Sequence, residues 1–166
     1  EDIVVFRGSK TAHDWFDDLR AIPLQVEGLG TVHEGFYTGL QGILATVWST
    51  LAPHVYVTGH SLGAARAYLF TLMLANAGLV PRAAVAFAPP RPGFADFRDK
   101  LIWSGALLRG YHNHFDPVPD VPVFPFCHPV PLIEISVAGD PNDPDELFKH
   151  HHGALYYEGV ASLTTI

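Results

Sequence analysis

The chain has 166 residues, of which 48% are hydrophobic and 16% charged, and its formal net charge is −7. This composition excludes a disordered chain, and the negative charge argues against nucleic acid and anionic membrane surfaces as partners. The length favours one domain over residues 1–166 with a sizeable core. Cys127 is the only cysteine, which excludes an internal disulfide. Neither a signal peptide nor a stretch of transmembrane length is visible, so we expect a soluble protein, either secreted or cytoplasmic.

Apolar runs alternate with segments of helical periodicity along the chain. The expected strands lie at 2–6, 23–26, 54–58, 83–88, 106–112 and 132–137. The expected helices lie at 12–20, 34–51, 62–77, 94–102 and 151–163. The proline-rich stretch 115–131 should be irregular. This alternation predicts an α/β fold with a mostly parallel sheet, helices on both faces, and a ligand site at the carboxyl ends of the strands.

The most informative motif is the pentapeptide Gly59–Gly63, which spells G-x-S-x-G between an expected strand and an expected helix. In this context it indicates a nucleophile elbow, a sharp turn that presents the Ser61 hydroxyl to substrate. The Leu62 N–H opens the helix and can point at a developing negative charge. The two glycines allow strand and helix to approach where a side chain would clash. The alternative is an ordinary capping serine in a glycine-rich turn.

Four further motifs stand in the order in which a known family has them. They are Val4–Ser9, Asp14–Leu19, Val32–Phe36 and Asn113–Pro119. Together with Gly59–Gly63 they make the chain resemble the fungal-type (class 3) triacylglycerol lipases, which have the α/β-hydrolase fold. The resemblance implies a serine carboxylic ester hydrolase with a Ser-His-Asp triad, which cleaves acylglycerols or similar lipid-like esters through an acyl-enzyme. It implies no metal and no organic cofactor.

The resemblance also assigns an oxyanion donor and the triad acid. Ser9 would act beside the Leu62 N–H through its own N–H and hydroxyl, and the alternative is that Ser9 caps the following helix. Asp116 would be the triad acid, because it precedes Pro-Val-Pro as in the family's D-x-V-P motif. Asp120, four residues later in the same loop, is the rival for that role. The chain order serine, acid, histidine is that of an α/β-hydrolase.

The triad base lies within the run His150–His152, and the resemblance favours His151. In the family an aromatic residue follows the base by about five positions in a helix, and Tyr156 stands in that place relative to His151. His152 is the alternative base. A metal site is disfavoured here, because adjacent histidines rarely converge on one ion.

Two apolar segments are candidates for contact with lipid. Residues 10–19 match the family's lid position, where Trp15 and Phe16 would cover the site and lift at an oil–water boundary. The alternative is an ordinary amphipathic surface helix. The loop Val118–Val130 could line an acyl pocket with Phe124 and Phe126, or could simply pack these two side chains.

The sequence leaves other functions open. The same site could serve an acyltransferase, a phospholipase or a polyesterase, because the shape of the pocket decides specificity. A lipase-like scaffold that only binds a ligand or partner is the alternative from a different class. The sequence shows no counterpart of the family's N-terminal strands and helix, so stability or the site could depend on a partner subunit or on lost residues. An apolar lid could also pair two copies, so a homo-oligomer is a further expectation.

Overall fold

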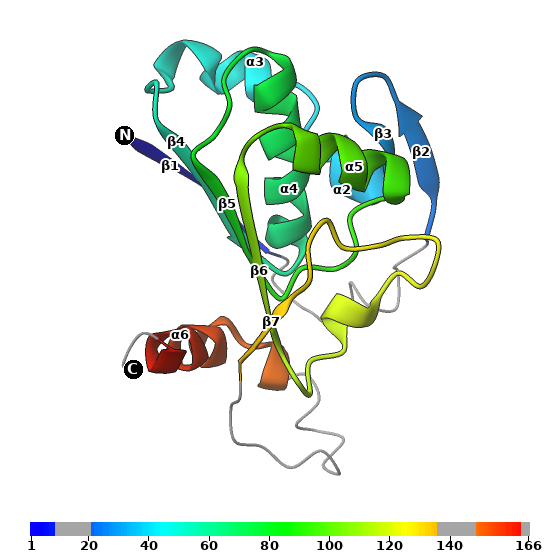
Figure 1. Cartoon of the computed structure of the whole chain (residues 1–166), viewed down its shortest axis with the longest axis vertical. Coiled ribbons are helices and arrows are strands. Elements are labelled where there is room, and N and C mark those ends of the chain that lie inside the picture. The colour runs from blue at the N-terminus through cyan, green and yellow to red at the C-terminus, as the bar shows by residue number, and fades with distance from the viewer. Residues whose placement is uncertain (9–20, 136–148, 164–166) are drawn as a thin grey trace.

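The computed structural model describes residues 1–8, 21–135 and 149–163, and its centre is a five-stranded sheet (Figure 1). The strands are β1 (Asp2–Phe6), β4 (Val55–His60), β5 (Ala83–Phe87), β6 (Leu107–Asn113) and β7 (Ile133–Ile135). They follow one another in the sheet in this order, and every pair is parallel. The parallel sheet predicted from the sequence is therefore confirmed.

A separate antiparallel hairpin pairs β2 (Pro23–Val26) with β3 (Gly30–His33). The first of these strands was predicted, whereas β3 was not. It begins at a glycine, and its burial does not alternate along the strand as that of β2 does. Isolated bridges from Val32 to Gly93 and from Gly93 to Cys127 tie β3 to segments far along the chain. Such long-range pairing leaves little trace in the local sequence.

The helices are α2 (Glu34–Thr38), α3 (Ile43–Val47), α4 (Leu62–Asn76), α5 (Ala95–Trp103) and α6 (Gly153–Leu163). Helices α2 to α5 lie on one side of the five-stranded sheet, and α6 lies on the other (Figure 1). Short 3-10 turns occupy Trp48–Thr50, Val118–Asp120 and Lys149–His151. No helix in the described ranges is long and apolar enough to cross a membrane. The helix expected at 12–20 lies outside the described residues.

The single helix expected over 34–51 is wrong, because the structure breaks it into α2, α3 and a 3-10 turn. The break falls at Gly42, whose φ of 81° lies in the left-handed region and cannot continue a right-handed helix. A side chain at Gly39 would also overlap the Arg66 guanidinium. The C-terminal helix likewise begins at Gly153 rather than at residue 151, after the 3-10 turn.

Helix α4 forms the centre of the main hydrophobic core. Its small residues Ala64, Ala65 and Ala67 are fully buried and let the helix axis approach the sheet closely. Large side chains from both neighbouring layers complete this core, among them Phe36, Leu40, Val55, Val57, Phe97 and Leu101. Because α4 is buried on nearly all sides, its first turn is held rigidly, and Ser61 stands directly before that turn.

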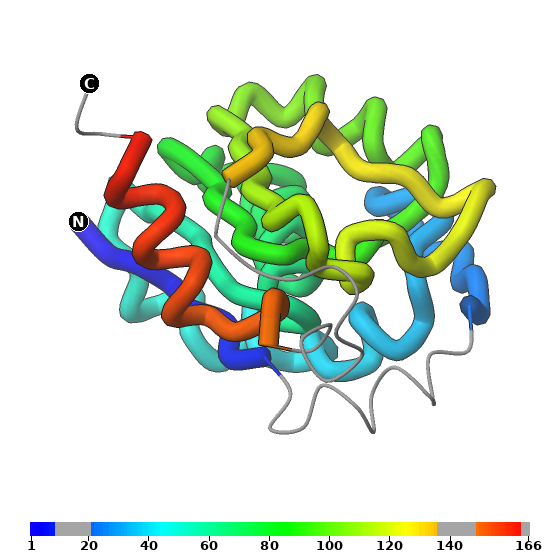
Figure 2. Tube along the Cα trace, turned by 90° about the horizontal axis from the view of Figure 1, so that it is seen from below, coloured from blue at the N-terminus to red at the C-terminus, as the bar shows by residue number. Residues whose placement is uncertain are grey.

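Among the described residues, the opposite face of the sheet is covered mainly toward its carboxyl end. There Tyr111 and Ile135 pack against Tyr156 of α6 in a second, smaller core. Nearer the amino ends of the strands, this face is more exposed within the described residues, since Ile3 and Leu107 are 68% and 56% exposed. The strands β1, β4 and β6 all end at the covered edge. Figure 2 looks onto this edge, across which α6 and the turn before it run.

Candidate active site

The elbow at Ser61 has a strained backbone and a tightly packed setting. Ser61 is only 4% exposed and has φ 59° and ψ −131°, a conformation that costs a non-glycine residue about 1–3 kcal/mol. Its N–H donates to the Phe87 carbonyl at 2.9 Å, which fixes the turn against β5. A side chain on Gly59 would overlap the Gly63 carbonyl, and one on Gly63 would overlap the Phe6 carbonyl. The close strand–helix approach expected from the motif is therefore present.

Two further features of the elbow concern its amide groups. The Ala64 and Ala65 N–H groups already donate to the Ser61 carbonyl. The Leu62 N–H lies in the first turn of α4, where an amide has no acceptor within its own helix.

The loop after β1 lies against the same turn, because a Cβ built on Gly8 would stand 3.3 Å from the Ser61 Cβ. Ser9, the next residue, lies outside the described residues, and so do Trp15 and Phe16.

A buried histidine–carboxylate pair lies at the same edge of the sheet. The Nδ1 atom of His151 is 2.8 Å from Oδ2 of Asp116, and the two residues are 4% and 3% exposed. Asp116 follows β6, whereas His151 ends the 3-10 turn before α6, so the fold joins positions 35 residues apart. The other ring nitrogen of His151, Nε2, is buried and has no hydrogen-bond partner within the described ranges.

The rival residues lie elsewhere. His152 is exposed, and its N–H donates to the Lys149 carbonyl to close the 3-10 turn. The Asp120 side chain is 82% exposed and forms an ion pair with Arg91 at 3.4 Å. The structure thus brings His151 to Asp116 and leaves both alternatives at the surface.

Tyr156 is the residue at this site that sequence reasoning missed. Its hydroxyl donates to Oδ2 of Asp116 at 2.6 Å and accepts the Asn113 N–H at 2.9 Å. The Val118 N–H donates to the other carboxylate oxygen at 2.9 Å. Burial and the neighbouring Asp116 charge raise the pKa of Tyr156 far above its ordinary range, so the phenol stays a donor. The only signal in the sequence was its spacing from His151, which helped to choose the base and gave Tyr156 itself no role.

The proline-rich loop divides its two phenylalanines between core and solvent. Phe126 is 4% exposed and packs edge-on against Phe94, with ring centroids 4.8 Å apart. Phe124 is 88% exposed and its neighbour Val123 is 68% exposed. Of the two interpretations of this loop, packing holds for Phe126. Phe124 instead forms an apolar tip that points into solvent.

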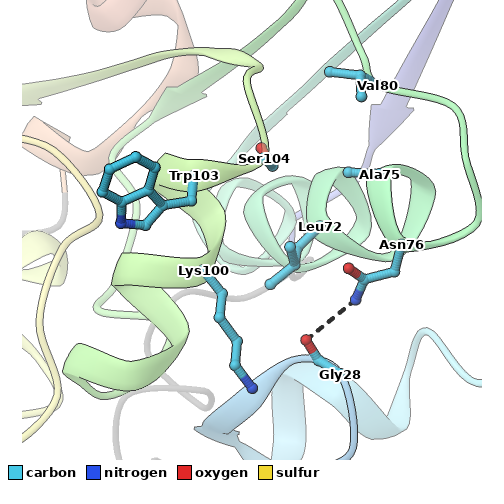
Figure 3. Close-up of a pocket in the computed structure, with 8 residues that line it drawn as sticks. All are labelled: Gly28, Leu72, Ala75, Asn76, Val80, Lys100, Trp103 and Ser104. Carbon is cyan, nitrogen blue, oxygen red and sulfur yellow. Dashed lines mark hydrogen bonds between the residues drawn. The ribbon is translucent and has the colours of Figure 1, made fainter.

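The pocket in Figure 3 lies far from these residues. It has a volume of about 400 Å³, and Leu72 and Asn76 line it from the last turns of α4. The Asn76 side chain donates to the Gly28 carbonyl at 3.2 Å across it. Since Ser61 precedes the first turn of the same helix, the rise of about 1.5 Å per residue separates the two by roughly 20 Å. This pocket is therefore no part of the Ser61 site.

Comparisons with known proteins agree with one another. The family model "Lipase (class 3)" matches residues 3–126. The lipase of Rhizomucor miehei is 35% identical over 141 residues, covering 75% of this chain and 39% of that lipase. A chloroplastic phospholipase A1 of Arabidopsis thaliana is 34% identical over 88 residues, covering 47% of this chain and 12% of that protein.

Solved structures show the same relationship. The native propeptide complex of Rhizomucor miehei lipase matches with a TM-score of 0.70 and 32% identity, over 80% of this chain and 48% of that one. Lipase II of Rhizopus niveus matches with a TM-score of 0.70 and 26% identity, over 81% and 56%. This chain thus spans about half the length of the structures it matches. The architecture is that of an α/β-hydrolase, and the chain belongs to the class 3 lipase family.

Proposed function

We propose that the protein is a serine carboxylic ester hydrolase that acts on lipid-like esters. The observation that carries the proposal is the buried His151–Asp116 hydrogen bond of 2.8 Å, at the sheet edge where the strained Ser61 turn also lies. Strain at a serine and a buried histidine–carboxylate pair each cost stability, and hydrolases use both at their active sites. Membership of the class 3 lipase family supports the same activity.

In the proposed mechanism, Ser61 is the nucleophile and His151 the base. The Ser61 hydroxyl attacks the ester carbonyl while its proton moves to Nε2 of His151. The resulting oxyanion receives hydrogen bonds from the Leu62 N–H and from Ser9. The alkoxide then leaves with the proton from His151, which yields an acyl-enzyme and an alcohol. Water attacks the acyl-enzyme with the same help from His151 and releases the fatty acid and free Ser61.

Asp116 has two tasks in this mechanism. By accepting the Nδ1 hydrogen of His151 it fixes the tautomer that leaves Nε2 free to take the proton. Its negative charge then stabilises the imidazolium that forms. The hydrogen bonds from Val118 and Tyr156 hold the carboxylate in place for both tasks.

A lipid ester is the substrate class that the family supports. The matched relatives include a lipase and a phospholipase A1, so acylglycerols come first and glycerophospholipids are the second candidate. Contact with a lipid surface is proposed through Val123 and Phe124, which are exposed on the loop between Asp116 and β7. Two neighbouring apolar side chains in solvent would partition favourably into lipid.

The test measures hydrolysis of p-nitrophenyl esters with acyl chains of two to sixteen carbons. Ser61→Ala should abolish turnover while the fold persists, and a fluorophosphonate should label the unmutated protein at Ser61. Ser104→Ala is the matched control, because its hydroxyl donates to the Leu101 carbonyl far from the elbow. Turnover that survives in Ser61→Ala would refute the mechanism. Absence of both turnover and labelling in the unmutated protein would favour a binding scaffold, and ester formation with added alcohols would favour an acyltransferase.

A further inference from the structure

His60, the last residue of β4, faces the proposed base. Its ring lies against that of His151, with centroids 4.6 Å apart and planes tilted by 36°. The Tyr156 ring meets it edge-on at 5.6 Å. The Nε2 atom of His60 is buried and has no hydrogen-bond partner in the described part of the chain. Burying a polar atom without a hydrogen-bond partner lowers stability. We therefore expect the histidine at this position to have a function that offsets this loss.

The contact restricts how the His151 ring can move. The hydrogen bond from Nδ1 to Asp116 fixes one atom of the ring, but by itself it still permits the ring to tilt about that bond. The His60 ring occupies one face of His151 and removes that freedom. Because His60 directly precedes Ser61, the residue that stops the tilt moves together with the nucleophile. The direction of Nε2 relative to the Ser61 turn is therefore set by one rigid backbone segment.

The charge state of His60 suits this position. Burial and, after it, the nearby His151 lower the pKa of His60 to about 4, against the opposing effects of the Asp116 charge and the His151 backbone. His152 lowers this pKa further, and Tyr156, whose ring contacts His60, has a pKa raised far above neutrality. An uncharged ring can lie beside an imidazolium, whereas a charged one would repel the proton that His151 has to accept.

We infer that His60 is a positioning residue for the reaction, an uncharged ring that holds the His151 imidazole in line with Ser61. The inference rests on the proposed function, since it assigns to His60 a task within that mechanism. Three consecutive residues then serve one reaction. His60 orients the base, Ser61 supplies the nucleophile, and Leu62 supplies an oxyanion donor.

The test compares His60→Phe, which keeps an uncharged ring, with His60→Ala, which removes it. In His60→Ala, kcat should fall about 10- to 100-fold with KM little changed, because a base displaced by about 1 Å loses a comparable factor. His60→Phe should recover most of this loss. The acid limb of the kcat/KM profile should follow a single ionisation in both the unmutated protein and His60→Phe, with midpoints within about half a pH unit. His128→Ala and His128→Phe are the matched controls. Burial likewise lowers the pKa of His128 to about 4, and its ring forms a hydrogen bond with the Pro119 carbonyl.

Nuclear magnetic resonance gives a readout that does not need turnover. The downfield His151 Nδ1 proton should be sharp in the unmutated protein and in His60→Phe, and should broaden in His60→Ala as the ring gains freedom. An unchanged kcat and an unchanged resonance in a folded His60→Ala would overturn the inference. A shift of the acid limb by more than one unit in His60→Phe would also overturn it, since His60 would then have carried charge. If the unmutated protein hydrolyses no ester, the proposed function fails, but the resonance still tests the contact.

Discussion

The hydroxyl of Tyr156 offers the sharpest test of how the acid is held. Tyr156→Phe removes one oxygen atom from a residue that is 1% exposed and leaves the ring in place. The change deletes the 2.6 Å hydrogen bond to Asp116 and leaves the Asn113 N–H, 2.9 Å from the same oxygen, without its acceptor. A hydrogen bond to a charged group contributes about 1.5–3 kcal/mol, and an unpaired buried donor costs about 1–3 kcal/mol.

Partial relaxation reduces the sum of these two effects, so we expect the free energy of unfolding to fall by about 2–4 kcal/mol. Asp116 keeps the bonds to Val118 and His151, so kcat should fall only about tenfold. Urea unfolding followed by circular dichroism measures the first quantity and ester hydrolysis the second. Tyr157→Phe is the control, because Tyr157 follows Tyr156 on the same helix and its side chain is 78% exposed. A loss in Tyr156→Phe no larger than that in Tyr157→Phe would refute the reasoning.

Three further predictions concern other parts of the molecule. Gly63→Ala should cost about 1–3 kcal/mol of stability or more, because the new methyl group would overlap the Phe6 carbonyl. Asp96→Asn should lower stability at pH 7 by less than about 1 kcal/mol, since Asp96 is mostly exposed. Burial alone would raise the pKa of Asp96, but hydrogen bonds from Thr31 and the Phe97 N–H outweigh it and lower that pKa. Its contribution is therefore present above the unfolded pKa and lost as the pH falls through the folded one. Phe124→Ser should leave hydrolysis of dissolved p-nitrophenyl acetate unchanged and reduce binding to phosphatidylcholine vesicles about tenfold.

A different measurement would contradict each of these three predictions. Gly153→Ala provides the comparison for Gly63→Ala, since its methyl group would meet only the His60 ring at 4.0 Å, and equal losses would exclude an overlap effect. A deficit in Asp96→Asn that persists below the folded pKa would show that the carboxylate charge is not responsible. Undiminished vesicle binding by Phe124→Ser would remove the loop tip from the proposed lipid contact.

The elements that sequence reasoning found are those whose pattern is local. Strand β1 is a short apolar run that ends shortly before Gly8, and helix α4 is a long apolar stretch followed by Gly78; both were confirmed. The break at Gly42 was missed because Phe36, Leu40 and Ile43 keep their helical spacing across it. Periodicity records which side chains face the core and does not record a reversal of φ at one glycine.

The site shows the same division. The elbow at Ser61 was visible because strand, turn and helix follow one another in the sequence. The spacing to Tyr156 favoured His151 over His152 through the resemblance alone. The 3-10 turn is what places the His151 side chain against Asp116. The parts played by Tyr156 and His60 depend on contacts between distant segments, such as the 40-residue separation of Tyr156 and Asp116. A single sequence does not show which distant segments come into contact, so these roles could not be predicted from it.

The exposed outer face of β1 connects the elbow to an edge of the sheet. Within the described residues β1 pairs with β4 alone, and Ile3 and Val5 on its outer face are 68% and 67% exposed. Edge strands of this kind exchange their amide hydrogens through local opening far more often than central ones. Yet Gly63 packs against the Phe6 carbonyl, and Ser61 packs against Gly8. Each opening of β1 thus withdraws the support of the Ser61 turn. Any surface that covers Ile3 would slow that opening and keep the nucleophile in place for a larger fraction of the time, without touching it.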